Sequence, residues 1–294
     1  MSVALKLKAH DKDLGGGFIV RRLLPAMARQ AVGPFLFFDH FGPVEVVPED
    51  NHDVRPHPHI GLATVTYLFS GAIMHRDSAG HEQRIEPGAI NWMSAGRGIV
   101  HSERRPADLA ASRYTNHGLQ LWTALPQAHE EDAPSFTHTP ADAIPEFARP
   151  GAQVRVLIGE AFGQRSPVAA YANTLYLDIQ LQGGERFELP ALAREMAVYP
   201  VDGEIRIDGE VVGDHTLALL EPGKTASLEA DTPRRLVVIG GDPLDAPRFI
   251  WWNFVSSRKA RIQQAAQDWQ AQVMGQVAGE TEFIPLPERA FKAD

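Results

Sequence analysis

The chain has 294 residues, of which 44% are hydrophobic and 22% charged, so it is long enough for two domains of ordinary globular composition. Its formal charge is -9 at pH 7, without a cluster of lysine or arginine, and direct binding to nucleic acid is therefore not expected. Cysteine is absent, which excludes disulfides, iron–sulfur clusters and thiolate metal sites, so any metal would have histidine, carboxylate, carbonyl or water ligands.

The N-terminal half is predicted to consist of short β-strands separated by tight turns. Residues 63–69 (ATVTYLF) are rich in β-branched and aromatic side chains and are followed by Ser70-Gly71. Turns are expected at Asp77-Ser-Ala-Gly80 and Glu86-Pro-Gly88. Further strands are predicted over residues 72–76, 81–85, 89–93 and 118–124. Strands this short and evenly spaced are typical of a sandwich or a barrel.

A second half of similar pattern follows residues 126–150, which are rich in proline, alanine and acidic residues. We expect an exposed connection between domains over that range. Strands resume at residues 153–158 and 174–180. A weak repeat relates the halves, because YLFSG at 67–71 and EPG at 86–88 have counterparts in YPVDG at 199–203 and EPG at 221–223. We therefore predict two barrels, over residues 1–135 and 136–294.

The tail is predicted to be helical. Ser256 and Ser257 are expected to cap a helix that begins near Arg258. Apolar side chains then recur at helical spacing, at Ile262, Ala265, Ala266, Trp269 and Val273. This face is expected to pack against a barrel, and a helix that binds a partner protein is the alternative.

The cellular compartment is predicted from the absence of targeting signals. The initial segment MSVALKLKAHDKDLGGG lacks the apolar core of a signal peptide. No apolar run approaches the length of a membrane span. A cytoplasmic location without membrane association is therefore expected.

The histidines are concentrated in one part of the chain, with eight of the twelve between His40 and His117. His57 and His59 are two residues apart, so in a strand both imidazoles point to the same face and can reach one ion. His101 and Glu103 have the same spacing and add a third imidazole and a carboxylate. Three neutral nitrogens and one anionic oxygen resemble non-haem iron sites more than structural zinc sites.

Histidines in such patterns can also have purely structural roles. A single pair of histidines two apart is often a chance surface feature, and the prediction depends on the second pair. His75, His81 and His117 are interpreted as strand or pocket residues, and His40 and His52 as packing residues or as part of the approach to the site. The remaining four histidines, His10, His129, His138 and His215, are expected to have no catalytic role.

Several longer motifs resemble those of the pirin family. They are FFDHFGP at 37–43, PHPHIG at 56–61, PGAINWMSAGRGIVHSE at 87–103 and HGLQLW at 117–122. Weaker matches, LYLD at 175–178 and GGDPL at 240–244, extend the resemblance over nearly the whole chain. The segment WWNFVSS at 251–257 departs from the family pattern.

The resemblance implies a fold and a site. Pirins are all-β proteins with two cupin (double-stranded β-helix) barrels, here followed by a C-terminal helix. Their metal ligands correspond to His57, His59, His101 and Glu103, in the N-terminal barrel. Ala63 and Thr64 stand where a general cupin has a glutamate, and Glu103 supplies the carboxylate instead. The second half contains no H-x-H or H-x-E sequence, so its barrel is expected to be metal-free.

The resemblance also implies two possible functions. Several pirins cleave the flavonol quercetin with dioxygen, and others are regulatory proteins that bind transcription factors or metabolic enzymes. For the first function we predict one divalent ion per chain, Fe²⁺ before Mn, Ni, Cu or Zn, with Glu103 as the base. Asn91, Met93 and Gln120 are candidate substrate-lining residues. A hydrolase or isomerase with a metal-bound water remains a third hypothesis.

Overall fold

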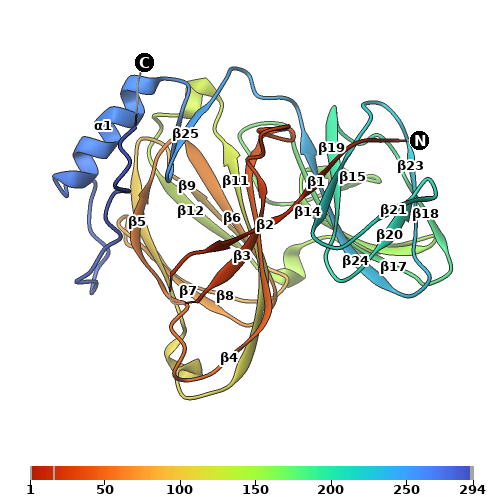
Figure 1. The fold of residues 1–294 in the computed structure, drawn as a ribbon, viewed down its shortest axis with the longest axis horizontal. Coiled ribbons are helices and arrows are strands. Elements are labelled where there is room, and N and C mark those ends of the chain that lie inside the picture. The colour runs from red at the N-terminus through yellow and green to blue at the C-terminus, as the bar shows by residue number, and fades with distance from the viewer. Residues whose placement is uncertain (1, 16, 292–294) are drawn as a thin grey trace. The chain divides into compact units, whose positions relative to one another are not determined.

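The computed structural model describes residues 2–15 and 17–291, and β-strands dominate it (Figure 1). Among these residues a single α-helix is present, α1 (Lys259–Gln270), close to the C-terminal end. The predicted all-β fold with a C-terminal helix is confirmed. No helix in the described part of the chain is long and apolar enough to cross a membrane.

The chain forms two compact units, and each is assembled from separate segments. Unit 1 comprises the residues up to Asp11, then Arg21–Asp39 and Thr139–Pro243. Unit 2 comprises Lys12–Val20, His40–His138 and the residues from Leu244 onward. The division of the sequence into domains at residues 135 and 136 stays a prediction.

Unit 1 contains a large antiparallel sheet and a smaller one. The large sheet has the order β1-β22-β19-β24-β17-β14-β13, so the first strand of the chain pairs with a strand more than 200 positions later. These strands are β1 (Val3–Lys8), β22 (Thr216–Leu220), β19 (Glu195–Pro200), β24 (Arg234–Gly241), β17 (Thr174–Leu181), β14 (Ala152–Ile158) and β13 (Glu146–Arg149).

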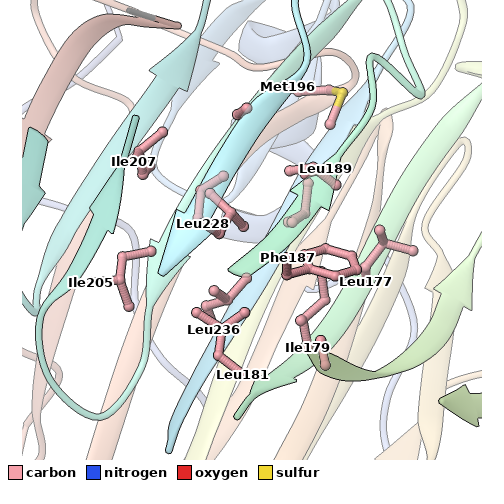
Figure 2. Packing of buried hydrophobic residues seen from close by; sticks show 14 of the residues in the cluster. Leu177, Ile179, Leu181, Phe187, Leu189, Met196, Ile205, Ile207, Leu228 and Leu236 are labelled. Carbon is pink, nitrogen blue, oxygen red and sulfur yellow. The ribbon is translucent and has the colours of Figure 1, made fainter. Parts of the chain in front are cut away.

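The smaller sheet of unit 1 has the order β18-β23-β20-β21, and a separate hairpin pairs β15 with β16. Their bounds are β18 (Arg186–Leu189), β23 (Ala226–Glu229), β20 (Ile205–Ile207), β21 (Glu210–Val212), β15 (Glu160–Ala161) and β16 (Gln164–Arg165). Figure 2 shows the core that these strands enclose. Successive side chains of a strand point to opposite faces of its sheet, so Leu177, Ile179 and Leu181, two apart on β17, all point into this core.

Unit 2 is built around a four-stranded sheet with the order β5-β10-β7-β8. These strands are β5 (Val54–His59), β10 (Ile99–Arg104), β7 (Ile73–Asp77) and β8 (Glu82–Ile85). The strands and turns predicted in this region are present. Gly80 and Gly88, in the two predicted turns, have φ values of +92° and +81°, which glycine adopts without strain.

Unit 2 also contains most of a seven-stranded sheet with the order β12-β9-β6-β11-β4-β3-β2, and some of its strands contribute residues to unit 1. Its strands are β12 (Ser135–Thr139), β9 (Ile90–Ser94), β6 (Leu62–Ser70), β11 (Tyr114–Ala124), β4 (Phe35–Val46), β3 (Ile19–Leu24) and β2 (His10–Asp13). Residues 126–150 are mostly exposed, and the chain passes from unit 2 to unit 1 between His138 and Thr139, as expected of a connection. The range also contains two strands that were not predicted. β12 and β13 lie within this range, because alternate side chains of β12 turn inward despite the neighbouring prolines.

The helix α1 packs against the strands of unit 2, the unit to which it belongs, as predicted. Its buried residues Ile262, Ala265 and Trp269 contact Ile60 and Val100, beside the strands that carry the histidines. The predicted serine cap was wrong: Arg258 occupies the N-cap position without a side-chain cap, and the Ser257 hydroxyl donates to Glu130 instead. Val273 was also wrong as a packing residue, because the helix ends at Gln270 and Val273 is 68% exposed. The tail hairpin of β25 (Phe249–Trp251) and β26 (Phe254–Ser256) precedes the helix.

Candidate metal centre

Two neighbouring antiparallel strands, β5 and β10, bring the two histidine motifs together. His101 lies directly opposite His57, and Ile99 lies opposite His59. Residues two apart on a strand share a face, so all three imidazoles project from the same side of the sheet. Gly61, with φ +66°, lets the chain turn directly after β5, where a Cβ atom would lie 2.0 Å from the Val255 carbonyl oxygen.

The three histidines form a compact and buried cluster. One ring nitrogen from each of His57, His59 and His101 lies within 4.8 Å of the others. Ring centroids are 4.4 Å apart for His57 and His101 and 5.0 Å apart for the other two pairs. Three buried nitrogens this close together, without a hydrogen bond among them, are an arrangement that suits a shared metal ion.

Hydrogen bonds at Nδ1 determine which nitrogen each ring offers. Nδ1 of His57 lies 2.9 Å from the Arg55 carbonyl oxygen, and Nδ1 of His59 lies 3.1 Å from that of Asn253. A carbonyl oxygen can only accept, so both rings donate from Nδ1 and keep the Nε2 lone pair. Nε2 of His101 is buried and has no hydrogen-bond partner, which would be costly without a ligand. The donor set therefore fits a divalent transition metal.

Burial keeps the histidines in the form that binds metals. It lowers the pKa of His57 to about 4, although the hydrogen bond with Arg55 acts in the opposite direction. Burial also lowers the pKa values of His59 and His101 well below 6.5, and the neighbouring histidines lower them further. At neutral pH all three rings are neutral, so their lone pairs are available to a cation.

Glu103 lies next to the cluster but is not a member of the 4.8 Å group. The pairing of β10 with β5 shifts register between His101 and Glu103. The pairing of β10 with β7 is regular and places Glu103 opposite His75. Burial raises the pKa of its carboxyl group to about 7 in the metal-free protein. Its role as fourth ligand stays a prediction.

The candidate substrate-lining residues share one face of the seven-stranded sheet that contains β9 and β11. The Trp122 ring lies 5.1 Å from that of His59, and Trp122 is in register with Thr64 and Met93. Two positions along the strands, Gln120 is in register with Thr66 and Asn91, so Asn91, Met93 and Gln120 lie on the same face as Trp122. The Thr66 hydroxyl donates to Oε1 of Gln120, and Asn91 is bound by a histidine of β12, His138. Their contact with a substrate stays a prediction.

The sequence did not reveal that His75 and Asp77 connect to the cluster through His101. Nδ1 of His75 lies 3.3 Å from Nδ1 of His101, and Nε2 of His75 lies 3.2 Å from Asp77, which also contacts His81. Asp77 was predicted in a turn, but it ends β7 and lies on the same face as His75, and the order β5-β10-β7 places that strand beside His101.

The remaining histidines of this region pack elsewhere. Nε2 of His40 lies 2.8 Å from Nε2 of His117, and His52 stacks on Phe18. His129 pairs with Asp132 on the surface. None of these rings belongs to the three-histidine group.

Comparison with known proteins gives full-length relatives. Residues 17–123 match the family model described as Pirin, and residues 176–275 match the Pirin C-terminal cupin domain. A pirin-like protein of Caulobacter vibrioides is 44% identical, with 97% of this chain and 100% of the relative covered. A protein of Pseudomonas aeruginosa named as a candidate quercetin 2,3-dioxygenase is 36% identical, with 90% and 83% covered. A crystal structure of quercetin 2,3-dioxygenase from Acinetobacter baumannii superposes with a TM-score of 0.88 at 30% identity, covering 98% of this chain and 97% of the other.

Proposed function

Because the chain belongs to the pirin family of two-cupin proteins, we propose that it is a metal-dependent dioxygenase that cleaves quercetin-like flavonols with O₂. The observation that carries the proposal is the buried cluster of three neutral histidines, with an Nε2 atom on His101 that has no partner. The names of the Pseudomonas aeruginosa and Acinetobacter baumannii relatives support quercetin as the substrate.

We assign the metal to His57, His59 and His101, with Glu103 as the fourth ligand, and we propose Fe²⁺ as the native ion. Three imidazoles and a carboxylate suit iron, and they also accept Mn, Ni, Cu or Zn. When bound, the ion would supply positive charge that favours ionisation of a flavonol hydroxyl and would bring the flavonol and O₂ together. One ion per chain is expected.

The protein's own groups account for the proton transfer and for the binding of a flat substrate. Glu103 is our candidate base, because it is the only carboxylate among the proposed ligands and could accept a proton while its bond to the ion loosens. We propose that it accepts the proton of the flavonol 3-hydroxyl. Trp122 and Met93 provide an apolar wall for an aromatic ring, and Asn91 and Gln120 provide polar groups beside it.

Oxygen uptake by the iron-loaded protein tests this proposal. We expect O₂ consumption with quercetin, and we expect His57→Ala to lose both the metal, measured by elemental analysis, and the activity. His129→Ala is the matched control, because this exposed histidine pairs with Asp132 and should leave both unchanged.

The alternative is a pirin that binds a partner protein without turnover. Absence of O₂ uptake over a panel of flavonols, at full iron loading, would contradict the dioxygenase and favour that alternative. Turnover without O₂ would favour a hydrolase or isomerase. The native metal, a cytoplasmic location and any protein partner stay predictions.

A further inference from the structure

We propose that Asp77 and His75 are positioning residues, which hold the His101 imidazole by two successive hydrogen bonds in the orientation that presents Nε2 to a metal ion. The proposal rests on the proposed function, since it presupposes a metal at the three-histidine cluster. It assigns a role to a buried histidine and a buried aspartate that the candidate chemistry does not otherwise use.

The contacts form a continuous path from the cluster to the end of β7. Nδ1 of His101 lies 3.3 Å from Nδ1 of His75, and Nε2 of His75 lies 3.2 Å from Oδ2 of Asp77. All three side chains are buried, so water does not compete for these bonds. The strand register accounts for the path, because β7 sets Asp77 directly opposite His101.

Hydrogen-bonding capacity gives this path a direction. The Asp77 carboxylate can only accept, so His75 donates to it from Nε2 and keeps a lone pair on Nδ1. His101 must then donate from its own Nδ1 to His75, which leaves its Nε2 lone pair unused. That atom is the one without a hydrogen-bond partner in the structure. The carboxylate therefore selects, two residues away, the tautomer that a metal requires.

The far end of the path is fixed in place. Oδ1 of Asp77 accepts hydrogen bonds from the backbone N–H groups of Ala79, at 2.9 Å, and His81, at 3.0 Å. The ring of His81 lies 2.9 Å from Oδ2. Phe136 stacks on His75, with ring centroids 4.3 Å apart and planes at 17°. Neither Asp77 nor His75 can rotate without losing several of these contacts.

His101 differs in this respect from the other two histidines of the cluster. His57 and His59 donate from Nδ1 to backbone carbonyl oxygens, which are neutral and cannot be changed by mutation of a side chain. His101 is connected to a carboxylate, and negative charge at the end of a hydrogen-bonded path makes an imidazole a stronger metal ligand. The proposal predicts that this one ligand can be weakened without altering any metal-binding atom.

An isosteric pair of variants at position 75 tests it. Asparagine places an acceptor oxygen close to where Nδ1 of His75 lies, whereas leucine places a methyl group there. The metal-free protein would be titrated with Co²⁺ in competition with a chromophoric chelator, and the visible spectrum of the Co²⁺ form recorded. We expect His75→Leu to weaken Co²⁺ affinity by roughly 10- to 100-fold and to change the spectrum. His75→Asn should recover most of the affinity.

Two further variants separate this role from general loss of structure. Asp77→Asn keeps the shape of the side chain but removes its charge, and it should also weaken binding. Arg76→Ala is the control, because Arg76 lies on the same strand but pairs with Glu82 at the surface. Its Co²⁺ affinity should equal that of the wild type.

The outcomes are distinguishable from failure of the proposed function. If the wild type does not bind Co²⁺ through His57, the metal site itself is wrong. If the wild type binds Co²⁺ and the folded His75→Leu and Asp77→Asn proteins bind it equally well, the positioning role is wrong. Should His75→Leu fail to fold, equal affinity of Asp77→Asn and the wild type would overturn the proposal.

Discussion

Glu103 is the residue at which metal binding and turnover can be separated. If it is the base as well as a ligand, Glu103→Gln should reduce flavonol turnover by roughly 10²- to 10⁴-fold, because an amide does not accept the proton at neutral pH. Metal content should fall less, since the amide oxygen and three histidines still bind. Steady-state O₂ uptake and elemental analysis of the same preparation measure both. A variant with full metal loading and full activity would rule out the base.

The histidines of the cluster also predict how stability depends on pH in the metal-free protein. Burial lowers the pKa of His57 from 6.5 to about 4, and those of His59 and His101 well below 6.5. The unfolded chain therefore binds more protons below about pH 6.5, and the free energy of unfolding decreases as the pH falls. Glu103 acts in the opposite direction, because its raised pKa favours the folded state as the pH falls from about 7 to 4.5.

Because the effect of three histidines on the free energy of unfolding should exceed the opposite effect of one carboxyl group, the metal-free protein should be less stable at pH 5 than at pH 7.5. Urea unfolding at the two pH values measures the difference. It should be smaller in His101→Asn, which lacks one of the buried imidazoles. An equal difference in the two proteins would show that His101 does not titrate as burial requires.

The individual site residues differ in how far the sequence could identify them. Alternation along strands predicted that His57 and His59 share one face, and the strands and turns that follow allowed the chain to bring His101 back to them. The structure shows the three histidines close together. The contact of His75 with His101 could not be predicted, because it depends on which strand lies next to β10. The unpartnered Nε2 atom likewise follows from packing in three dimensions.

At the scale of elements, a buried ion pair holds the chain that precedes α1. Glu130 lies 2.7 Å from the guanidinium of Arg248, with both side chains buried, and accepts hydrogen bonds from Ser256 and Ser257. Arg248 also pairs with Asp245, so Glu130→Ala removes one of its two ion pairs and the acceptor of the serine hydroxyl groups, and it should destabilise the protein by about 1.5–3 kcal/mol. Chemical unfolding of the metal-free protein gives this value.

Glu131→Ala provides the matched control, one residue along the chain. Glu131 pairs with Arg258 and with Arg261, and its own side chain is 44% exposed to solvent, so its loss should cost at most about 1 kcal/mol. Equal effects of the two substitutions would show that Glu130 does not stabilise the segment in the way its burial suggests.

The same glutamate explains why the serine cap was predicted wrongly, although α1 begins next to Arg258 as predicted. Ser256 and Ser257 have the right position for a cap, but a buried carboxylate competes for their hydroxyl groups, and no sequence pattern reveals this partner. Strand β12 was not predicted because its proline-rich surroundings resemble a loop, whereas pairing with β9 stabilises it in the structure. Strands β6, β7 and β9 were predicted well, because their own residues determine them.

At the scale of the whole molecule, the candidate metal centre lies entirely in one of the two units. All three clustered histidines, and the residues that hold their Nδ1 atoms, belong to unit 2. Two barrels could be predicted from the internal repeat and the family motifs. The pairing of β1 with β22 could not, because nothing local specifies a partner so distant along the chain.

Because the cluster lies wholly in unit 2, a substitution that destabilises the core of unit 1 should leave metal binding unchanged. Leu177 is fully buried in the core shown in Figure 2, and Leu177→Ala should cost about 2–5 kcal/mol of stability. Metal content per folded chain should remain that of the wild type. Thermal unfolding and elemental analysis provide the two numbers, and a large loss of metal from the folded variant would contradict this expectation.

Anomalous diffraction at the iron edge, from crystals of the Fe²⁺-loaded protein, tests the central claim most directly. We predict one peak per chain, within bonding distance of Nε2 of His57, His59 and His101. A peak at another place in the chain would contradict the assignment of the site. So would the absence of a peak here when elemental analysis shows one iron ion per chain.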